Sequence, residues 1–249
     1  MLRGLWVRCV LAVMTVSLAG LVTVCVLVVP RWSNLLIHAG RLWARSLLAA
    51  AGARVRFHGL ERARRHRPCI FIANHQSIVD IWVLLTFLPP NTRFVAKREL
   101  FRIPIFGWAL AASGCIAIDR GNRSRAIRSL RTAGERIRAG RSVVLFPEGT
   151  RSRDGSLKPF KKGAFHLAVQ AGVPVVPVAI TGSFEVFPPR RLRVRPGPVE
   201  VFVESPIDVA PFRPEDHVGL MQIVYEVIAQ RFHARRPAGD ERAMAQEST

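Results

Sequence analysis

Two residue types that can carry out acid–base chemistry stand five positions apart in the stretch Ile70–Trp82, IFIANHQSIVDIW. An apolar run stops at His75, and Asp80 follows just before the apolar pattern resumes. Residues five apart on one continuous helix are separated by about 140° after one full turn, so their side chains point away from each other. The two side chains can therefore cooperate only if His75 lies outside the helix that contains Asp80.

The flanking residues predict such an arrangement. A buried strand ends near Asn74, and Ser77 is a suitable N-cap for a helix with Asp80 at its third position, an acidic version of the capping box. His75 then lies in the tight turn between strand and helix. There its Nδ1–H can donate to the Asp80 carboxylate and leave Nε2 free as a base. The pair alone leaves two interpretations open, a catalytic couple or a turn followed by a helix cap.

A second group of candidates lies in residues 146–163, FPEGTRSRDGSLKPFKKG, directly after another predicted strand. Gly149 permits a tight turn with positive φ, and Glu148 and Arg151 flank that turn. Three lysines follow in the same loop: Lys158, Lys161 and Lys162. These cations suit a phosphate, because a guanidinium binds it in bidentate fashion and an ammonium as a point charge. A solvated basic loop is the competing interpretation.

A further arginine, Arg120, follows a short apolar run in residues 114–122, GCIAIDRGN. That run is typical of a strand. The adjacent Asp119 is most simply explained as a local ion-pair partner of Arg120.

The elements that must position these residues are those of an α/β domain. Residues 69–74, 142–147 and 173–182 predict short buried strands, because each is a continuous apolar run ended by turn residues. Two prolines in the third run suggest an edge strand or a bulge. Residues 191–204 alternate and break at Pro-Gly, so we expect a hairpin there.

Two helices are also predicted. In residues 124–140 the apolar positions repeat near the helical period, and Gly140 is a plausible C-cap. Residues 214–235 predict an amphipathic closing helix. We expect an N-terminal membrane region over residues 1–54, one α/β domain over residues 55–236 and a disordered tail over residues 237–249.

Composition and charge limit the function classes. The chain has 249 residues, 49% of them apolar, which is enough for one sizeable core. Its four cysteines have no metal-ligand spacing and are expected to be reduced thiols, so no metal site is predicted. A formal net charge of +20 attracts polyanions in general, whether anionic lipid, nucleic acid or an acidic protein. Charge alone does not select among these partners.

The N-terminus favours a membrane. Residues 9–29 are 21 consecutive uncharged residues, and a helix of that length spans about 31 Å, enough for the hydrocarbon core of a bilayer. A cleaved signal peptide would have a shorter apolar region and a small-residue cleavage site, and a buried core helix is seldom this long without a polar face. We therefore predict a membrane helix, which either spans the bilayer or lies in one leaflet.

Residues 31–56 predict an amphipathic helix, with Arg41 and Arg45 between apolar positions spaced three and four apart. Its tryptophans and arginines suit a membrane interface, and a helix packed on the soluble domain fits the pattern equally well. Arginines are more frequent after the apolar segment than before it. This asymmetry predicts an inner-membrane protein whose main domain faces the cytoplasm.

Four stretches in order resemble the motifs of the glycerolipid acyltransferases, most closely the bacterial 1-acyl-sn-glycerol-3-phosphate (lysophosphatidate) acyltransferases. They are Asn74-His75-x4-Asp80, GCIAIDR at 114–120, FPEGTRS at 146–152 and VPVVP at 173–177. The stretch FVAKRELFRIPIFGWAL at 94–110 also resembles that family. The similarity covers roughly residues 55 to 205, and the third motif is unusually complete.

The resemblance implies a fold and a reaction. The fold is a mixed, largely parallel sheet flanked by helices. The reaction transfers an acyl group from acyl-CoA or acyl-acyl carrier protein to the sn-2 hydroxyl of lysophosphatidate, which gives phosphatidate. His75 is the general base and Asp80 holds its tautomer. The scheme needs no covalent acyl-enzyme, no metal and no cofactor other than the acyl donor as co-substrate.

The resemblance also implies a substrate site. Its acceptor region is formed by five residues of the third motif: Phe146, Glu148, Gly149, Thr150 and Arg151. Arg151 and Arg120, together with Lys97, bind the acceptor phosphate. Glu148 cannot bind phosphate itself, because like charges repel, and is expected to orient Arg151 or the glycerol hydroxyl.

Three alternatives differ in substrate or in class. The same chemistry serves another lyso-lipid, such as a lyso-ornithine lipid, since these motifs are shared by enzymes with several acceptors. A membrane-anchored nucleic-acid-binding protein fits the charge, but the arginines are dispersed without interleaved aromatic residues, so no nucleic acid partner is expected. A non-catalytic lipid-binding relative fits the membrane segment, but an intact His75 and Asp80 argue against lost activity.

Overall fold

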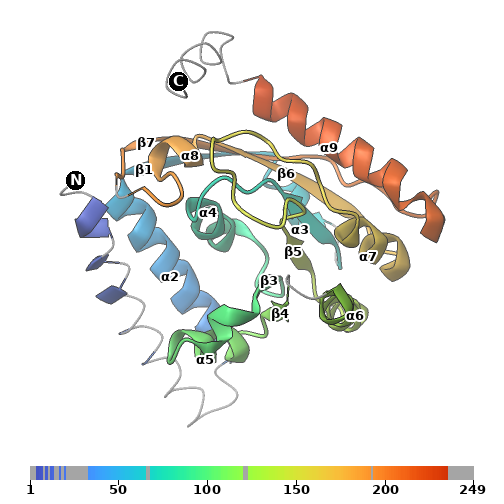
Figure 1. The fold of residues 1–249 in the computed structure, drawn as a ribbon, viewed down its shortest axis with the longest axis horizontal. Coiled ribbons are helices and arrows are strands. Elements are labelled where there is room, and N and C mark those ends of the chain that lie inside the picture. Colours follow the sequence, from blue (N-terminus) through green and yellow to red (C-terminus); the bar gives the residue numbers. More distant parts are fainter. Residues whose placement is uncertain are drawn as a thin grey trace.

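Seven strands form one mixed sheet in the part of the chain that the structure describes (Figure 1). The computed structural model describes residues 4–7, 9–10, 12–13, 17, 20, 33–65, 68–119, 123–191 and 193–234. In spatial order the strands are β1 (Ala53–His58), β7 (Gly197–Val203), β6 (Val175–Thr181), β2 (Ile70–Ala73), β5 (Val143–Leu145), β3 (Arg93–Lys97) and β4 (Ile116–Ile118). All neighbours are parallel except β6 and β7, which confirms the predicted mixed, largely parallel sheet.

Helices cover both faces of this sheet. They are α2 (Ser33–Ala51), α3 (Arg62–Arg65), α4 (Val79–Phe87), α5 (Phe106–Ala112), α6 (Arg123–Arg138), α7 (Gly163–Ala171), α8 (Ser183–Val186) and α9 (His217–His233), with the short 3-10 helices η2 (Arg98–Arg102) and η3 (Pro214–Asp216). Phe71 of β2 packs in the core with α2 and α4, whereas Ile70 and Ile72 pack in the core with α6, α7 and α9. Both faces of β2 are therefore buried, which explains its continuous apolar sequence.

The sheet topology places the two candidate motifs side by side. β2 and β5 are parallel neighbours, with Ile72 opposite Leu145. Their carboxyl ends therefore lie at the same edge of the sheet, and the loops that contain His75 and Arg151 both leave from that edge.

Two predictions about strands are wrong. The strand predicted over residues 173–182 is β6, which contains Pro177 alone, begins after Pro174 and is interior, between β7 and β2. Pro177 is tolerated because antiparallel pairing with β7 begins only at Val178, and its carbonyl still accepts the N–H of Glu204 at 2.9 Å. The predicted hairpin over residues 191–204 is instead the single strand β7, because β1 and β6 occupy its two edges.

The amphipathic helix predicted over residues 31–56 is α2, which ends at Ala51; residues 53–58 are strand β1. Ala44, Leu47 and Ala51 are fully buried in the core shared with α4. Trp43 and Trp82 of α4 form a T-shaped pair with 6.5 Å between ring centroids. The inner face of α2 is therefore packed on the α/β domain, while Leu42 remains 56% exposed.

No helix among these described residues has the length and apolar character needed to cross a membrane. Residues 9–29, in which we predict a membrane helix, lie largely outside the described part of the chain, and the predicted tail over residues 237–249 lies wholly outside it. The helices predicted over residues 124–140 and 214–235 are confirmed as α6 and α9, the second beginning with η3.

The packing of α2 makes a stability prediction with an internal control. Leu47→Ala removes a fully buried side chain and should lower the free energy of unfolding by about 2–5 kcal/mol. Leu42→Ala, on the exposed face of the same helix, should change it by less than about 0.5 kcal/mol. Urea unfolding of the full chain in detergent micelles measures both. If Leu47→Ala lowered the free energy of unfolding as little as Leu42→Ala, α2 would not contribute to this core.

Candidate active site

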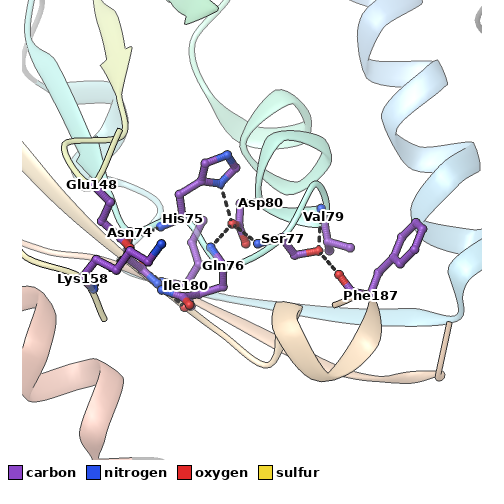
Figure 2. Close-up of polar contacts among 10 residues, drawn as sticks. All are labelled: Asn74, His75, Gln76, Ser77, Val79, Asp80, Glu148, Lys158, Ile180 and Phe187. Atoms are coloured by element: carbon purple, nitrogen blue, oxygen red, sulfur yellow. Dashed lines mark hydrogen bonds and ion pairs between the residues drawn. The ribbon is translucent and has the colours of Figure 1, made fainter. Parts of the chain in front are cut away.

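The turn between β2 and α4 holds His75 against Asp80. The Nδ1 atom of His75 lies 2.9 Å from Asp80 Oδ2, and the two side chains point toward one another (Figure 2). Asp80 is fully buried and His75 is 7% exposed. The carboxylate can only accept, so the imidazole carries its proton on Nδ1 and presents Nε2 as an acceptor. The predicted orienting contact is confirmed.

The same Asp80 oxygen also organises the backbone of the turn. Oδ2 accepts the N–H of Gln76 at 2.7 Å and the N–H of Ser77 at 2.8 Å (Figure 2). Accepting the Ser77 N–H is half of the predicted capping box, although α4 begins at Val79 and Ile78, not Ser77, occupies its N-cap position. The other half differs, because Ser77 Oγ accepts the N–H of Val79 and donates to the carbonyl of Phe187 at 2.6 Å. Asp80 is therefore a helix cap and the orienting partner of His75 at once.

Three further contacts fix the turn from neighbouring segments. The Asn74 amide donates to the carbonyl of Ile180 at 2.8 Å and accepts its N–H at 2.7 Å, which ties the end of β2 to β6. The N–H of Ser152 donates to the carbonyl of His75 at 3.0 Å. Sequence reasoning did not assign Asn74 or Ser152 to the site. Asn74 lies in the first motif, but the Ser152 contact is made by its backbone and leaves no trace in the sequence.

Glu148 has a different position from the one we expected. Its Oε1 accepts the backbone N–H of His75 at 2.6 Å, and its Oε2 accepts the backbone N–H of Lys158 at 3.3 Å (Figure 2). The side chain is 3% exposed and makes no ion pair with Arg151 among the described residues. Glu148 therefore positions the His75 turn from the loop after β5 and does not orient the arginine.

Burial raises the pKa of Glu148 to about 8, against an ordinary value of 4.5. The two backbone N–H donors oppose this shift, and the nearby Asp80 charge adds to it. At neutral pH this carboxyl is therefore largely protonated and contributes little negative charge to the site.

His75 lines a cavity of about 700 Å³. Its ring stacks on Phe146 with 4.0 Å between centroids and 18° between planes. Most of the remaining wall is apolar and comes from α2, α4, β3, η2 and α5, including Trp43, Ile78, Ile81, Leu85, Leu88, Phe94, Leu100, Phe106 and Leu110. Among the described residues no protein group is hydrogen-bonded to Nε2, so this nitrogen is available to a molecule bound in the cavity.

The cavity brings together most of the predicted substrate-site residues: Lys97, Phe146, Gly149, Thr150 and Arg151 line it with His75. The Nζ atom of Lys97 also lies 3.3 Å from Oε1 of Glu99, and both side chains are exposed. Arg120 lies outside the described residues, and Asp119, expected to pair with it, is 3.6 Å from Arg98. The part of the chain described here contains no cluster of three or more His, Cys, Asp or Glu side chains arranged to hold a metal.

An oriented imidazole beside an apolar cavity is the arrangement that acyl transfer to a hydroxyl needs. A family model described as Acyltransferase matches residues 54–181, and the chain belongs to that family. This confirms the resemblance seen in the four motifs.

The names of similar proteins specify an acyl acceptor. The chain is 34% identical to the 1-acyl-sn-glycerol-3-phosphate acyltransferase of Cocos nucifera over 215 residues, which are 81% of this chain and 69% of that protein. The chloroplastic 1-acyl-sn-glycerol-3-phosphate acyltransferase BAT2 of Brassica napus is 40% identical over 141 residues, 56% of this chain and 41% of that longer protein. The crystal structure of the 1-acyl-sn-glycerophosphate acyltransferase PlsC from Thermotoga maritima matches with a TM-score of 0.82 and 30% identity, over 95% of this chain and 97% of that one.

The buried Glu148 predicts how stability depends on pH. Between about pH 4.5 and 8 the folded protein holds a proton on this carboxyl that the unfolded chain has released. The free energy of unfolding should therefore fall as the pH rises through this window, by roughly 2–4 kcal/mol. Glu148→Gln cannot ionise and should lack this decrease.

Urea unfolding of the full chain in detergent micelles at pH 5, 6, 7 and 8 measures the effect. Glu226→Gln, at an exposed position of α9, is the matched control and should keep the wild-type slope. A wild-type slope in the Glu148 variant would show that this carboxyl is ionised throughout the range.

Proposed function

We propose that the protein transfers an acyl group from an acyl thioester, acyl-CoA or acyl-acyl carrier protein, to the sn-2 hydroxyl of 1-acyl-sn-glycerol-3-phosphate. The observation that carries the proposal is the cavity itself: one space is lined by the oriented His75, by an apolar wall and by the cations Arg151 and Lys97. These three kinds of lining match a hydroxyl, a fatty acyl chain and a phosphate. The names of the relatives support the same acceptor.

The reaction begins at His75 Nε2. The acceptor hydroxyl gives its proton to this nitrogen as its oxygen attacks the thioester carbonyl carbon, and a new C–O bond forms. Asp80 stabilises the resulting imidazolium without taking the proton, because it stays hydrogen-bonded to Nδ1–H. When the tetrahedral oxyanion collapses, the C–S bond breaks and the departing thiolate takes the proton from Nε2. The products are an ester and a free thiol, and His75 returns to its starting state.

The surroundings of His75 serve this sequence. The Phe146 ring, stacked on the imidazole, limits the ring's rotation and excludes water from one face. The buried backbone contacts of Glu148 and Asn74 keep the turn in place as the imidazole gains and loses charge. A base held by packing and hydrogen bonds requires little reorganisation during the reaction.

The apolar and the charged parts of the cavity lining suit different parts of the two substrates. The apolar wall suits an acyl chain, since each buried CH2 group contributes about 0.8 kcal/mol. Arg151 and Lys97, with Arg120, bind the acceptor phosphate through charge-assisted hydrogen bonds. Thr150 and Gly149 complete that end of the site. No metal or cofactor takes part in this scheme beyond the acyl donor.

The proposed location is the inner membrane, with the main domain in the cytoplasm. Both lipids are amphiphilic, so a site beside the bilayer avoids moving them into water. The uncharged run of residues 9–29 and a net charge of +20 support attachment to an anionic membrane surface.

The proposed reaction can be tested directly in detergent micelles. Labelled acyl-CoA and acyl-acyl carrier protein serve as donors, with lysophosphatidate and lyso-ornithine lipid as rival acceptors. Product with lysophosphatidate supports the proposal, and the better donor identifies the second substrate. Product with lyso-ornithine lipid alone would keep the chemistry and replace the acceptor.

The general-base role predicts a loss of rate without a loss of fold. His75→Ala should reduce kcat by at least about a thousandfold, and Asp80→Asn by at least about a hundredfold, because the base or its oriented tautomer is lost. Asp80→Asn should also lower stability by about 1 kcal/mol through the weakened cap. Steady-state kinetics and thermal unfolding separate the two effects. A His75→Ala enzyme with wild-type kcat would exclude this mechanism.

If Arg151 binds the acceptor phosphate, its removal should change KM for the acceptor and leave KM for the acyl donor nearly unchanged. Arg151→Ala should raise KM for lysophosphatidate about tenfold or more while changing KM for the acyl donor by less than about twofold, because a charge-assisted contact contributes about 1.5–3 kcal/mol. Arg153→Ala, an exposed neighbour that does not line the cavity, is the control. A rise confined to the donor KM would place Arg151 on the donor instead.

A further inference from the structure

The helix α5 forms part of the cavity wall and exposes apolar side chains on its outer side. Trp108 is 57% exposed and shares one face of the helix with Ala111 and Ala112, which are also exposed. Phe106, on the opposite face, lines the cavity. Ile103, which lies between η2 and α5, is 47% exposed. One short helix thus has the cavity on one side and an exposed apolar surface on the other.

These side chains are carried by a tightly packed segment. A Cβ at Gly107 would collide with the carbonyl oxygen of Phe101, so only a glycine lets α5 approach η2 this closely. Ile105 has a φ of 65° and a ψ of −58°, and the N–H of Phe106 donates across it to the carbonyl of Pro104 at 2.7 Å. This is the strained form of the γ-turn, and it is especially unfavourable for a β-branched residue. An exposed apolar group and a strained turn both lower stability in water, so their coincidence indicates a function for this surface.

Exposed apolar side chains also occur in the neighbouring N-terminal region. Among the described residues there, Leu5, Trp6 and Val13 are each at least 60% exposed, and Leu42 of α2 is 56% exposed. The helix α2 follows the uncharged run of residues 9–29 in the sequence and contacts α5 (Figure 1). The apolar surface of α5 therefore lies beside the element that follows the predicted membrane segment.

The residues that lead into α5 are basic. Lys97 pairs with Glu99, and Arg98 lies 3.6 Å from Asp119. Arg102 is exposed and makes no ion pair within the described part of the chain. This segment therefore adds a positive charge next to the apolar side chains, which is the combination that an anionic lipid surface attracts.

The size of the surface favours a bilayer over a protein partner. The exposed parts of Trp108 and Ile103 amount to roughly 250 Å², whereas each partner of a stable protein complex buries about 800 Å². A bilayer has no such minimum, because it takes up the adjacent N-terminal region as well. Tryptophan is also the side chain most typical of a membrane–water interface.

We propose that the outer side of η2 and α5 is a membrane-docking surface for an anionic bilayer. In this η2–α5 surface, Trp108 and Ile103 enter the interface and Arg102 contacts the lipid headgroups. The inference rests on the proposed membrane location and extends it, since it assigns a specific contact outside the N-terminal region. The cavity then lies one helix away from the lipid phase that holds its substrates.

The first test measures whether position 103 is covered by lipid. Full-chain Ile103→Cys and Ile223→Cys proteins are inserted into preformed vesicles of phosphatidylglycerol and phosphatidylcholine and treated with a water-soluble maleimide. Mass spectrometry follows each labelled site, and each rate is divided by that of the same site in the urea-unfolded chain. Ile223, on α9, is 41% exposed and provides a matched control. Labelling at 103 should be about tenfold slower than at 223, because the interface excludes the reagent from side chains buried in it.

The second test measures whether Trp108 enters the interface. The emission of Trp108 is taken as the difference between the wild type and Trp108→Phe in the same vesicles. Lipids with bromine on their acyl chains should reduce this difference at least about twofold, because bromine quenches only at short range and the apolar face is buried about 5–10 Å deep. The fully buried Trp82 is the control, and the difference between the wild type and Trp82→Phe should not change.

Three results would overturn the inference. Equal labelling rates at positions 103 and 223 would show that lipid does not cover this surface. Unquenched Trp108 emission would place the side chain in water or against protein. Protection at 103 that falls when the protein is diluted into more lipid would assign the surface to a second copy of the chain. None of these readouts uses turnover, so an inactive wild type would refute the proposed reaction and leave the docking surface tested.

Discussion

One carboxylate oxygen, Asp80 Oδ2, holds the site together. It accepts two backbone N–H groups of the turn and the Nδ1–H of His75, all within 2.9 Å. The contacts that start α4 are therefore the contacts that fix the base. The carboxylate is fully buried and Oδ1 has no hydrogen-bond partner among the described residues, so Oδ2 receives all three donors and any movement of the imidazole would remove one of them. The rigidity of the base follows from the cost of leaving this oxygen unpaired.

The sheet supplies the second constraint. β2 and β5 are parallel neighbours, so the turn that carries His75 and the loop that carries Arg151 leave from the same edge. Glu148 and Ser152 connect the two loops through backbone contacts to His75, and Asn74 connects the turn to β6. The base and the cations thus belong to one hydrogen-bonded unit, although 76 positions separate His75 from Arg151 in the sequence.

Local charge matters more to this site than the large net charge. A formal +20 attracts anionic lipids over a distance, but it is spread over the chain. At the cavity, burial suppresses the charge of Glu148 by raising its pKa to about 8, and Arg151 makes no ion pair with a carboxylate among the described residues. A buried acid that is mostly neutral can thus support the turn without weakening the attraction for a phosphate.

The sequence by itself determined the family, the sheet class and the pairing of His75 with Asp80, because these depend on local spacing: an apolar strand, a turn and a capped helix lie within 13 residues. It also placed Phe146, Gly149, Thr150 and Arg151 at one strand end. The role of Glu148, the interior position of β6 and the single strand β7 depended on which segments pair across the sheet. Only the tertiary structure decided them, because burial and backbone contacts between distant segments leave no periodic signal in the sequence.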